Sequence, residues 1–271
     1  MIYVISDVFG RIDAFHNILR QIDLKDDDTL YVLGNVIDGD QKGIEIIEEI
    51  MESKNIKLLL GNHEYMMMKV INNLYGVWPP VCLDGKDAAL WAYNGGKETI
   101  KDLTLLPREE SSKLFDFLNN CQYEETVVIN GKKYVLTNST PKSFYKAWLT
   151  KEGESLQNNA VYSCDKDFAV WHRLKDGEIP NNCIVVHGHT CVWDYDEEKK
   201  SVVYKKMHPD QEPEEEDEEM KESQSAHEFL PSVRIKGKDI AINCGGYKMS
   251  GHQLPGRLAC LCLDTMEEFY A

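Results

Sequence analysis

Continuous apolar runs alternate with amphipathic segments along the first 75 residues of the chain. The runs at 2–6, 29–34 and 56–61 lack the period-two alternation of a half-exposed strand, so they predict strands covered on both faces. Between them, residues 13–23 and 42–53 repeat apolar side chains every three or four positions, which predicts helices with one buried face. Strands that alternate with helices in this way are typical of βαβ units in a parallel sheet.

The rest of the chain predicts more helices, followed by strands that we expect to be mostly antiparallel. Helices are expected at 64–75, 87–96 and 108–120. Strands are expected at 125–131, 132–139, 182–190, 201–206, 233–243 and 256–264. Two turn pairs, Asn130-Gly131 and Lys236-Gly237, are typical of hairpins. We therefore expect an α/β (α+β) fold in which two mixed sheets pack face to face with helices outside.

The composition of the chain indicates a cellular compartment and argues against some classes of binding partner. The formal net charge of −16 argues against binding of nucleic acid or of an anionic membrane. No apolar run approaches the roughly 18 residues of a membrane span, and the chain enters its first strand without the basic leader of a secretion signal. Eight cysteines without CxxC spacing are more typical of buried thiols than of disulfides or a zinc site. We expect a cytoplasmic protein.

The negative charge is concentrated in one segment. Residues 212–222 carry eight acidic residues against one lysine, and such a block is usually a solvated insert. The alternative is a segment that docks a partner or binds ions. We predict a single domain over residues 1–271, with an acidic insertion at 207–230 inside it.

Polar side chains follow the predicted strands at the points where each strand ends. These residues are Asp7, Asn35, Asp38, Asn62, His63, Asn138, His187 and His189. In an open α/β sheet such strand ends converge on one crevice. Oxygen and imidazole groups from several strand ends describe a metal site better than a nucleophilic triad. By itself, however, His187 is more typical of a structural histidine at a strand end.

The motifs SDVFG, LGNVID, GNHE, LTNST and GHT occur in an order that resembles the calcineurin-like metallophosphoesterases. Within that family they resemble the bacterial branch of serine/threonine protein phosphatases and diadenosine tetraphosphatases. The segments WAYNGG, VWHRL, INCGGY and GRLACLCLD resemble the same branch, so the likeness spans nearly the whole chain apart from the acidic insertion. The resemblance implies a four-layer α/β/β/α sandwich and a pair of divalent ions, bridged by an Asp and by the hydroxide that attacks phosphorus.

Six positions match the metal ligands of that family: Asp7, Phe9, Asn35, Asn62, Asn138 and His189. Three of the six are substituted, because Phe9 and Asn138 stand where the family has His, and Asn35 stands where it has the bridging Asp. A neutral amide cannot bridge two dications, so a two-metal site is not expected. The remaining donors, Asp7, Asn35, Asn62, Asn138 and His189, suit at most one weakly held Mn²⁺, Mg²⁺ or Ca²⁺ ion.

The resemblance also assigns roles in phosphoester chemistry. Asp38 and His63 match the pair that protonates the leaving group, and Arg173 in VWHRL matches a phosphate-binding arginine. The phosphate-binding Arg of a second motif is replaced by Gly39. Structural alternatives stay open, since Asp38 and His63 can hold two loops together and Arg173 can be a surface cation.

Three functional hypotheses follow. The first is a catalytically impaired pseudophosphatase that binds a phosphorylated small molecule or a protein partner. The alternative is an active metal-dependent phosphoesterase, either a phosphoprotein phosphatase or a dinucleoside polyphosphate hydrolase, with a rebuilt mononuclear site. The third is a purely structural role through the acidic insertion. Whether the chain is an enzyme is therefore left open by the sequence.

Overall fold

The computed structural model describes residues 1–72, 85–152, 162–175, 177–196, 201–204, 230–249, 252–253 and 256–271. The strands are β1 (Ile2–Ile5), β2 (Thr29–Val32), β3 (Ile56–Leu58), β4 (Glu124–Ile129), β5 (Lys132–Thr137), β6 (Ile184–His187), β7 (Trp193–Asp196), β8 (Ser201–Tyr204), β9 (Arg234–Lys236), β10 (Asp239–Ala241), β11 (Lys248–Met249), β12 (His252–Gln253), β13 (Ala259–Cys262) and β14 (Glu268–Tyr270). The helices are α1 (Ile12–Ile22), α2 (Gly43–Glu52), α3 (Asn62–Asn72), α4 (Lys86–Trp91), α5 (Lys97–Leu105), α6 (Arg108–Asn120), α7 (Tyr145–Glu152) and α8 (Asp165–Trp171), with a π-helical turn η1 (Ala92–Gly96) and a 3-10 turn η2 (Lys142–Phe144).

Two five-stranded mixed sheets form the centre of the fold. The first has the order β14-β13-β1-β2-β3, in which β1, β2 and β3 are parallel neighbours as the sequence predicts. The second has the order β4-β5-β6-β10-β9. Its central strands β5, β6 and β10 run parallel, so the expectation of mostly antiparallel pairing in this half is wrong for them. The reason is connectivity, since β5 reaches β6 through a long crossover that contains α7 and α8.

The side chains of β1 show how the first sheet is covered on both faces. Tyr3 and Ile5 belong to the hydrophobic cluster on the helix side. Val4, which points the other way, belongs to the cluster between the two sheets, together with Leu136 of β5 and Ile240 of β10. All of them are buried. The unbroken apolar run at 2–6 is therefore explained by a strand between a helix layer and a second sheet.

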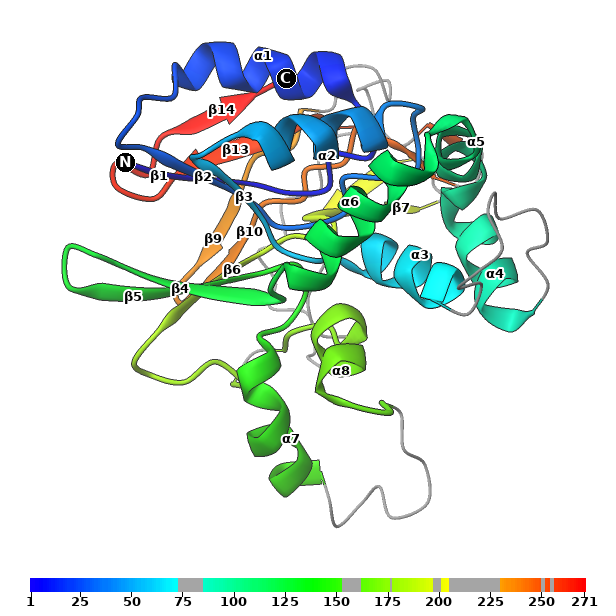
Figure 1. Cartoon of the computed structure of the whole chain (residues 1–271). Helices are drawn as coiled ribbons and strands as arrows, with labels where there is room; N and C mark the ends of the chain where they lie inside the picture. The colour runs from blue at the N-terminus through cyan, green and yellow to red at the C-terminus, as the bar shows by residue number, and fades with distance from the viewer. Residues whose placement is uncertain are drawn as a thin grey trace.

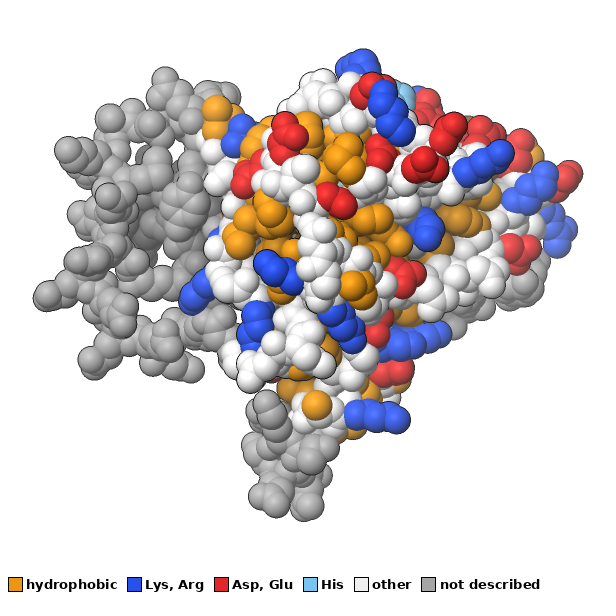
Figure 2. Space-filling view, turned by 90° about the vertical axis from the view of Figure 1, so that its left-hand side faces the viewer, with side chains coloured by type: hydrophobic (Ala, Val, Ile, Leu, Met, Phe, Trp, Pro, Cys, Tyr) orange, Lys and Arg blue, Asp and Glu red, His pale blue; other side chains and the backbone are white. Residues whose placement is uncertain are grey.

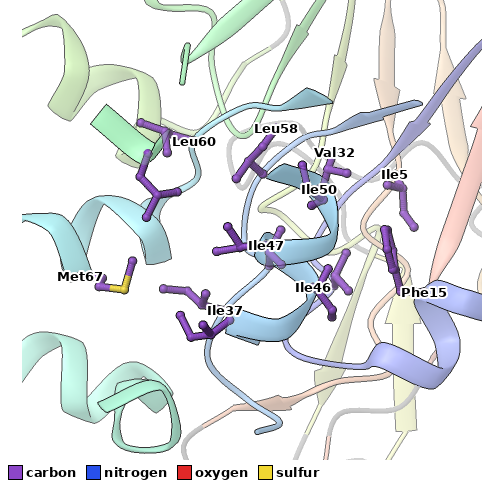
Figure 3. Close-up of a cluster of buried hydrophobic side chains, with 14 of the residues drawn as sticks. Ile5, Phe15, Val32, Ile37, Ile46, Ile47, Ile50, Leu58, Leu60 and Met67 are labelled. Atoms are coloured by element: carbon purple, nitrogen blue, oxygen red, sulfur yellow. The ribbon is translucent and has the colours of Figure 1, made fainter. Parts of the chain in front are cut away.

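Helix α2 supplies much of the helix-side core. Figure 3 shows Ile46, Ile47 and Ile50 of α2 directed toward the strands, where Val32 and Leu58 meet them. Each of the three isoleucines is 0–1 % exposed. Full burial of such a side chain contributes roughly 1.5–3 kcal/mol, so this apolar face fixes α2 against the sheet.

The layers are visible in Figure 1, where α1, α2 and α6 lie over the first sheet and the β4–β5 hairpin lies below it. The outer face of the second sheet is covered by η2 and the segment after α8, through Val135, Val185, Phe144, Leu174 and Ile179. Two mixed sheets packed face to face with helices outside confirm the predicted α/β sandwich.

Both hairpins predicted from the turn pairs are present in the structure. The hairpin at Asn130-Gly131 joins β4 and β5, and the hairpin at Lys236-Gly237 joins β9 and β10. In the acidic insertion predicted at 207–230, all residues except Leu230 lie outside the described residues. Over the described part of the chain, no helix has both the length and the apolar character that crossing a bilayer requires.

Candidate functional site

Asp7 follows β1 and lies at the centre of the candidate site. Its backbone has a φ of +57°, and its N–H donates to the carbonyl of Gly34 at the end of β2. The carboxylate is buried and accepts hydrogen bonds from Ser6 Oγ at 2.7 Å, the His189 N–H at 2.9 Å and Asn35 Nδ2 at 3.0 Å. Burial raises the pKa of Asp7 above its ordinary value of 3.8, and these three hydrogen bonds oppose the rise.

The side-chain amide of Asn35 has a defined orientation. Its Nδ2 donates to the Asp7 carboxylate, which accepts, and its Oδ1 accepts from the backbone N–H of His63 at 3.2 Å. A flipped amide would lose both hydrogen bonds. Gly61 makes room for this contact, because a Cβ there would lie 2.2 Å from Asn35 Oδ1. Position 35 therefore presents an N–H donor to Asp7, where the resemblance implies a bridging carboxylate.

The other three expected ligands lie around this pair. His189, whose backbone N–H caps Asp7, places its Nδ1 3.0 Å from Asn62 Oδ1. Asn138 donates its Nδ2 to the carbonyl of Leu33 at 2.6 Å. Within the described residues, the buried Oδ1 of Asn138 has no hydrogen-bond partner. The structure thus brings the strand-end residues together from both sheets.

Asp38 and His63 form a buried pair beside the cluster. His63 Nδ1 lies 2.6 Å from Asp38 Oδ2, and both side chains are at most 2 % exposed. Asp38 also accepts from Thr99 Oγ1 at 2.6 Å and from the Trp91 indole N–H at 3.1 Å. The helix kinks beside this pair at Gly95, which has a φ of +103° that other residues rarely adopt, and a Cβ there would lie 3.3 Å from Gly39 N. Sequence reasoning identified the pair but missed Trp91 and Thr99.

An aromatic stack surrounds position 9, where the resemblance implies a histidine ligand. Phe9 is 2 % exposed, stacks on Tyr247 with ring centroids 4.1 Å apart, and meets the His63 ring edge-on at 4.8 Å. Tyr247 is also buried, and its hydroxyl accepts from Asn243 Nδ2 at 3.3 Å. Burial raises the pKa of Tyr247 well above 10. The side chain at position 9 is therefore part of a packed apolar contact.

Two charged residues that sequence reasoning missed hold the strand-end loops in place. Glu64 is fully buried and accepts from the backbone N–H groups of Asn35, Val36 and Gly61 at 2.8–2.9 Å. Arg11 donates from its guanidinium to the carbonyls of Asp7, Val8, Gly245 and Gly246. Burial lowers the pKa of Arg11 to about 10, so it remains a cation at neutral pH. The Glu of the GNHE motif was the available sequence signal for Glu64, whereas Gly245 and Gly246 lie far from Arg11 in the sequence.

Two other candidate residues, His187 and Arg173, make no hydrogen bond to the strand-end cluster within the described residues. His187 places Nε2 2.9 Å from Asp239 Oδ1, and Arg234 pairs with the other carboxylate oxygen of Asp239 at 2.9 Å. His187 is therefore a structural histidine of the second sheet. Arg173 lies shortly after the end of α8, and its side chain is exposed.

The donor set does not fit a two-metal centre. Two dications about 3.5–4 Å apart repel by roughly 15–20 kcal/mol at an effective dielectric of ~20, which bridging anions must offset. Of the five expected ligands, Asp7 alone is a carboxylate, and both of its oxygens already accept hydrogen bonds. Within the described residues, no three His, Cys, Asp or Glu side chains form a group able to hold a metal ion.

Comparison with known proteins identifies the lineage. The family model described as calcineurin-like phosphoesterase matches residues 1–250. A solved structure described as that of a candidate diadenosine tetraphosphatase is 12% identical, with a TM-score of 0.51 over 100% of this chain and 92% of that chain. A protein serine/threonine phosphatase from Saccharomyces cerevisiae is 12% identical, with a TM-score of 0.51 over 100% of this chain and 79% of that chain.

At such low identity the solved structures show a common fold, and a comparison with curated protein sequences gives no match. The family model, in contrast, spans all the strand-end motifs from Asp7 to His189. The chain belongs to the calcineurin-like phosphoesterase family.

Proposed function

We propose that this chain is a catalytically impaired member of its family, a pseudophosphatase that binds a phosphorylated small molecule or a protein in the cytoplasm without hydrolysing it. The observation that carries the proposal is the hydrogen bond from Asn35 Nδ2 to Asp7 Oδ1. It places a neutral donor against the one remaining carboxylate ligand. The groups that would hold two ions instead satisfy each other.

Hydrolysis of a phosphoester by two metal ions requires an activated hydroxide and neutralisation of the charge that develops on phosphorus. Both requirements depend on a charged, symmetric bridge and on imidazole ligands. Phe9 offers no lone pair, and its stack on Tyr247 occupies the place of one imidazole. The Asp38–His63 pair can assist the leaving group, but general acid catalysis contributes only about 10²–10⁴-fold.

A second candidate function is hydrolysis with a single weakly held Mn²⁺, Mg²⁺ or Ca²⁺ ion. Two observations favour it. Asp38 and His63 keep the short contact expected of a general acid and its partner. Asn138 Oδ1 is a buried oxygen whose lone pairs meet no donor among the described residues, and amide oxygens bind hard cations.

The proposal is tested by hydrolysis of p-nitrophenyl phosphate by the unmodified protein with excess Mn²⁺. We expect the hydrolysis rate with Mn²⁺ to be no higher than that of the metal-free sample. We also expect the Asp7→Ala variant to have the same rate as the unmodified protein. Mn²⁺-dependent turnover that Asp7→Ala abolishes would contradict the proposal and establish the mononuclear alternative.

Restoration of the lost ligands provides the complementary test. Phe9→His, Asn35→Asp and Asn138→His together should give Mn²⁺ binding by calorimetry and measurable turnover. Each single substitution should do little, because the ligands act as a unit. If the triple variant binds Mn²⁺ but does not hydrolyse the substrate, further parts of the site have been lost.

A further inference from the structure

A pocket of about 540 Å³ lies outside the strand-end cluster, against α7. It is bounded by η2 and α7 on one side and by Lys175, Gly177, Glu178 and Pro180 on the other. Its volume falls within the range of about 300–1,000 Å³ that is usual for small-molecule sites. None of the residues that line it belongs to the candidate metal ligands.

Aromatic side chains form one wall of this pocket. Phe144, Trp148 and Phe168 line it, and the rings of Trp148 and Phe168 have centroids 5.4 Å apart at 42°. Phe168 is in turn stacked on His172, with centroids 4.5 Å apart. The rings of Trp148 and Phe168 also both contact the His172 ring, with Trp148 at 5.8 Å. An aromatic wall of this kind favours a planar ligand that can stack against it.

The carboxylate in the lining is already compensated. Glu178 accepts from His172 Nε2 at 3.0 Å and from the Lys175 backbone N–H at 2.8 Å. His172 Nε2 donates to this carboxylate, and its Nδ1 lies 3.2 Å from the Tyr162 hydroxyl. Burial alone would raise the pKa of Glu178, but the hydrogen bond with His172 and then that with Lys175 N–H lower it overall.

Positive charge at the pocket is less completely matched. Among the described residues, no carboxylate lies within ion-pair distance of the Lys175 ammonium, which is exposed at the pocket. The Lys238 ammonium donates to the neutral carbonyls of Ile179 and Pro180 and to Asn181 Oδ1. Figure 2 shows Lys and Arg side chains spread over this face, several of them in its lower part, with Asp and Glu side chains among them.

From this geometry we propose that the α7 pocket binds a planar aromatic molecule that carries one negative charge, with its ring against Trp148 and its anionic group at Lys175. The ring gains contact with the aromatic wall, and the anion meets the exposed ammonium, since Glu178 in the same lining is already hydrogen-bonded to His172. This site is independent of phosphoester chemistry, so it does not rest on the proposed function.

The test uses the full-length chain and three probes that share one ring: indole-3-acetate, indole-3-acetamide and tryptamine. Isothermal titration calorimetry should rank their affinities in that order. In Lys175→Gln the anion should lose about threefold to fivefold in affinity, the range of an exposed charge pair, while the neutral amide is unchanged. Lys132→Gln, at an exposed position at the start of β5, is the matched control and should leave all three affinities unchanged.

A second variant keeps the test independent of the lysine. Ala147 lines the pocket from an exposed position on α7, so Ala147→Trp should fill the pocket without disturbing the core and abolish binding of every probe. Tighter binding of tryptamine, or equal effects of Lys175→Gln on acid and amide, would overturn the proposal. So would sedimentation showing a dimer that Ala147→Trp dissociates, because the occupant would then be a second copy of the chain.

Discussion

The amide Nδ2 of Asn35 lies 3.0 Å from Oδ1 of Asp7 and donates a hydrogen bond to it. This contact joins the loops that follow β1 and β2. It also shows what a single change from Asp to Asn does at this place. Two carboxylates would repel each other without a metal ion between them, whereas an amide and a carboxylate attract. With Asn at position 35, the contact with Asp7 is a hydrogen bond that needs no cation between the two side chains.

We expect Asn35→Asp to destabilise the protein without added metal by about 3 kcal/mol or more at neutral pH, because it buries a second charge against Asp7. The deficit should shrink as the pH falls toward about 5, since the crowded carboxylates have a raised pKa and a shared proton removes the repulsion. Urea denaturation at several pH values measures this. Asn17→Asp on the exposed face of α1 is the control and should change stability little. Equal stability of the two variants would contradict the buried contact.

Glu64 provides the second prediction. Its carboxylate accepts from backbone N–H groups in both the β2 and the β3 loops, so Glu64→Gln would turn an NH₂ group toward donors. Buried unsatisfied donors cost about 1–3 kcal/mol each. We expect a loss of about 2–3 kcal/mol in the free energy of unfolding, against little change for Glu52→Gln at an exposed position of α2. If Glu64→Gln is as stable as its control, Glu64 does not hold these loops.

Much of the first sheet was predictable from local pattern. The apolar runs and the amphipathic segments at 13–23 and 42–53 identify β1, β2, β3, α1 and α2 to within a few residues. These elements are adjacent in sequence, so connection length and handedness leave few arrangements. The second sheet was harder, because the parallel pairing of β6 with β10 depends on residues brought together from positions 185–187 and 239–241.

The positions of the site residues were predictable, but their contacts were not. Motif order placed Asp7, Asn35 and Asn62 at neighbouring strand ends. It could not show that the Asn35 amide would turn toward Asp7, because that orientation depends on the His63 N–H behind it. The stack of Phe9 on Tyr247 joins residues far apart in the chain, and no local pattern marks such a pair.

The Phe9 stack provides the third prediction. Phe9→Ala would leave a cavity between the His63 and Tyr247 rings, and truncation of a fully buried Phe costs about 3–5 kcal/mol. Phe117→Ala on α6, where the ring is only partly buried, should cost clearly less. Thermal or urea unfolding of both variants measures the difference. A Phe9→Ala protein as stable as Phe117→Ala would mean that position 9 is not packed and that the site is open to ligands.

The last prediction concerns acid stability and the second sheet. Burial alone would raise the pKa of Asp239, but the hydrogen bond with His187 and the charges of His187 and Arg234 lower it below its ordinary value of 3.8. A lowered pKa in the folded state stabilises the fold above the unfolded pKa, and this contribution is lost as the pH falls through the folded pKa. Asp239→Asn should therefore lose most stability, by about 3 kcal/mol, near neutral pH, where it removes the carboxylate that His187 and Arg234 contact.

The difference in stability between wild type and Asp239→Asn should narrow below about pH 4. There the Asp239 carboxylate of the wild type takes up a proton, first in the unfolded state and at lower pH in the folded state. Urea unfolding of both proteins between pH 3 and pH 7 provides the comparison. Asp27→Asn, at an exposed position before β2, is the control and should follow the wild-type curve across this range. A constant gap between wild type and Asp239→Asn at every pH would show that the variant acts through packing, and that the Asp239 carboxylate does not titrate with folding.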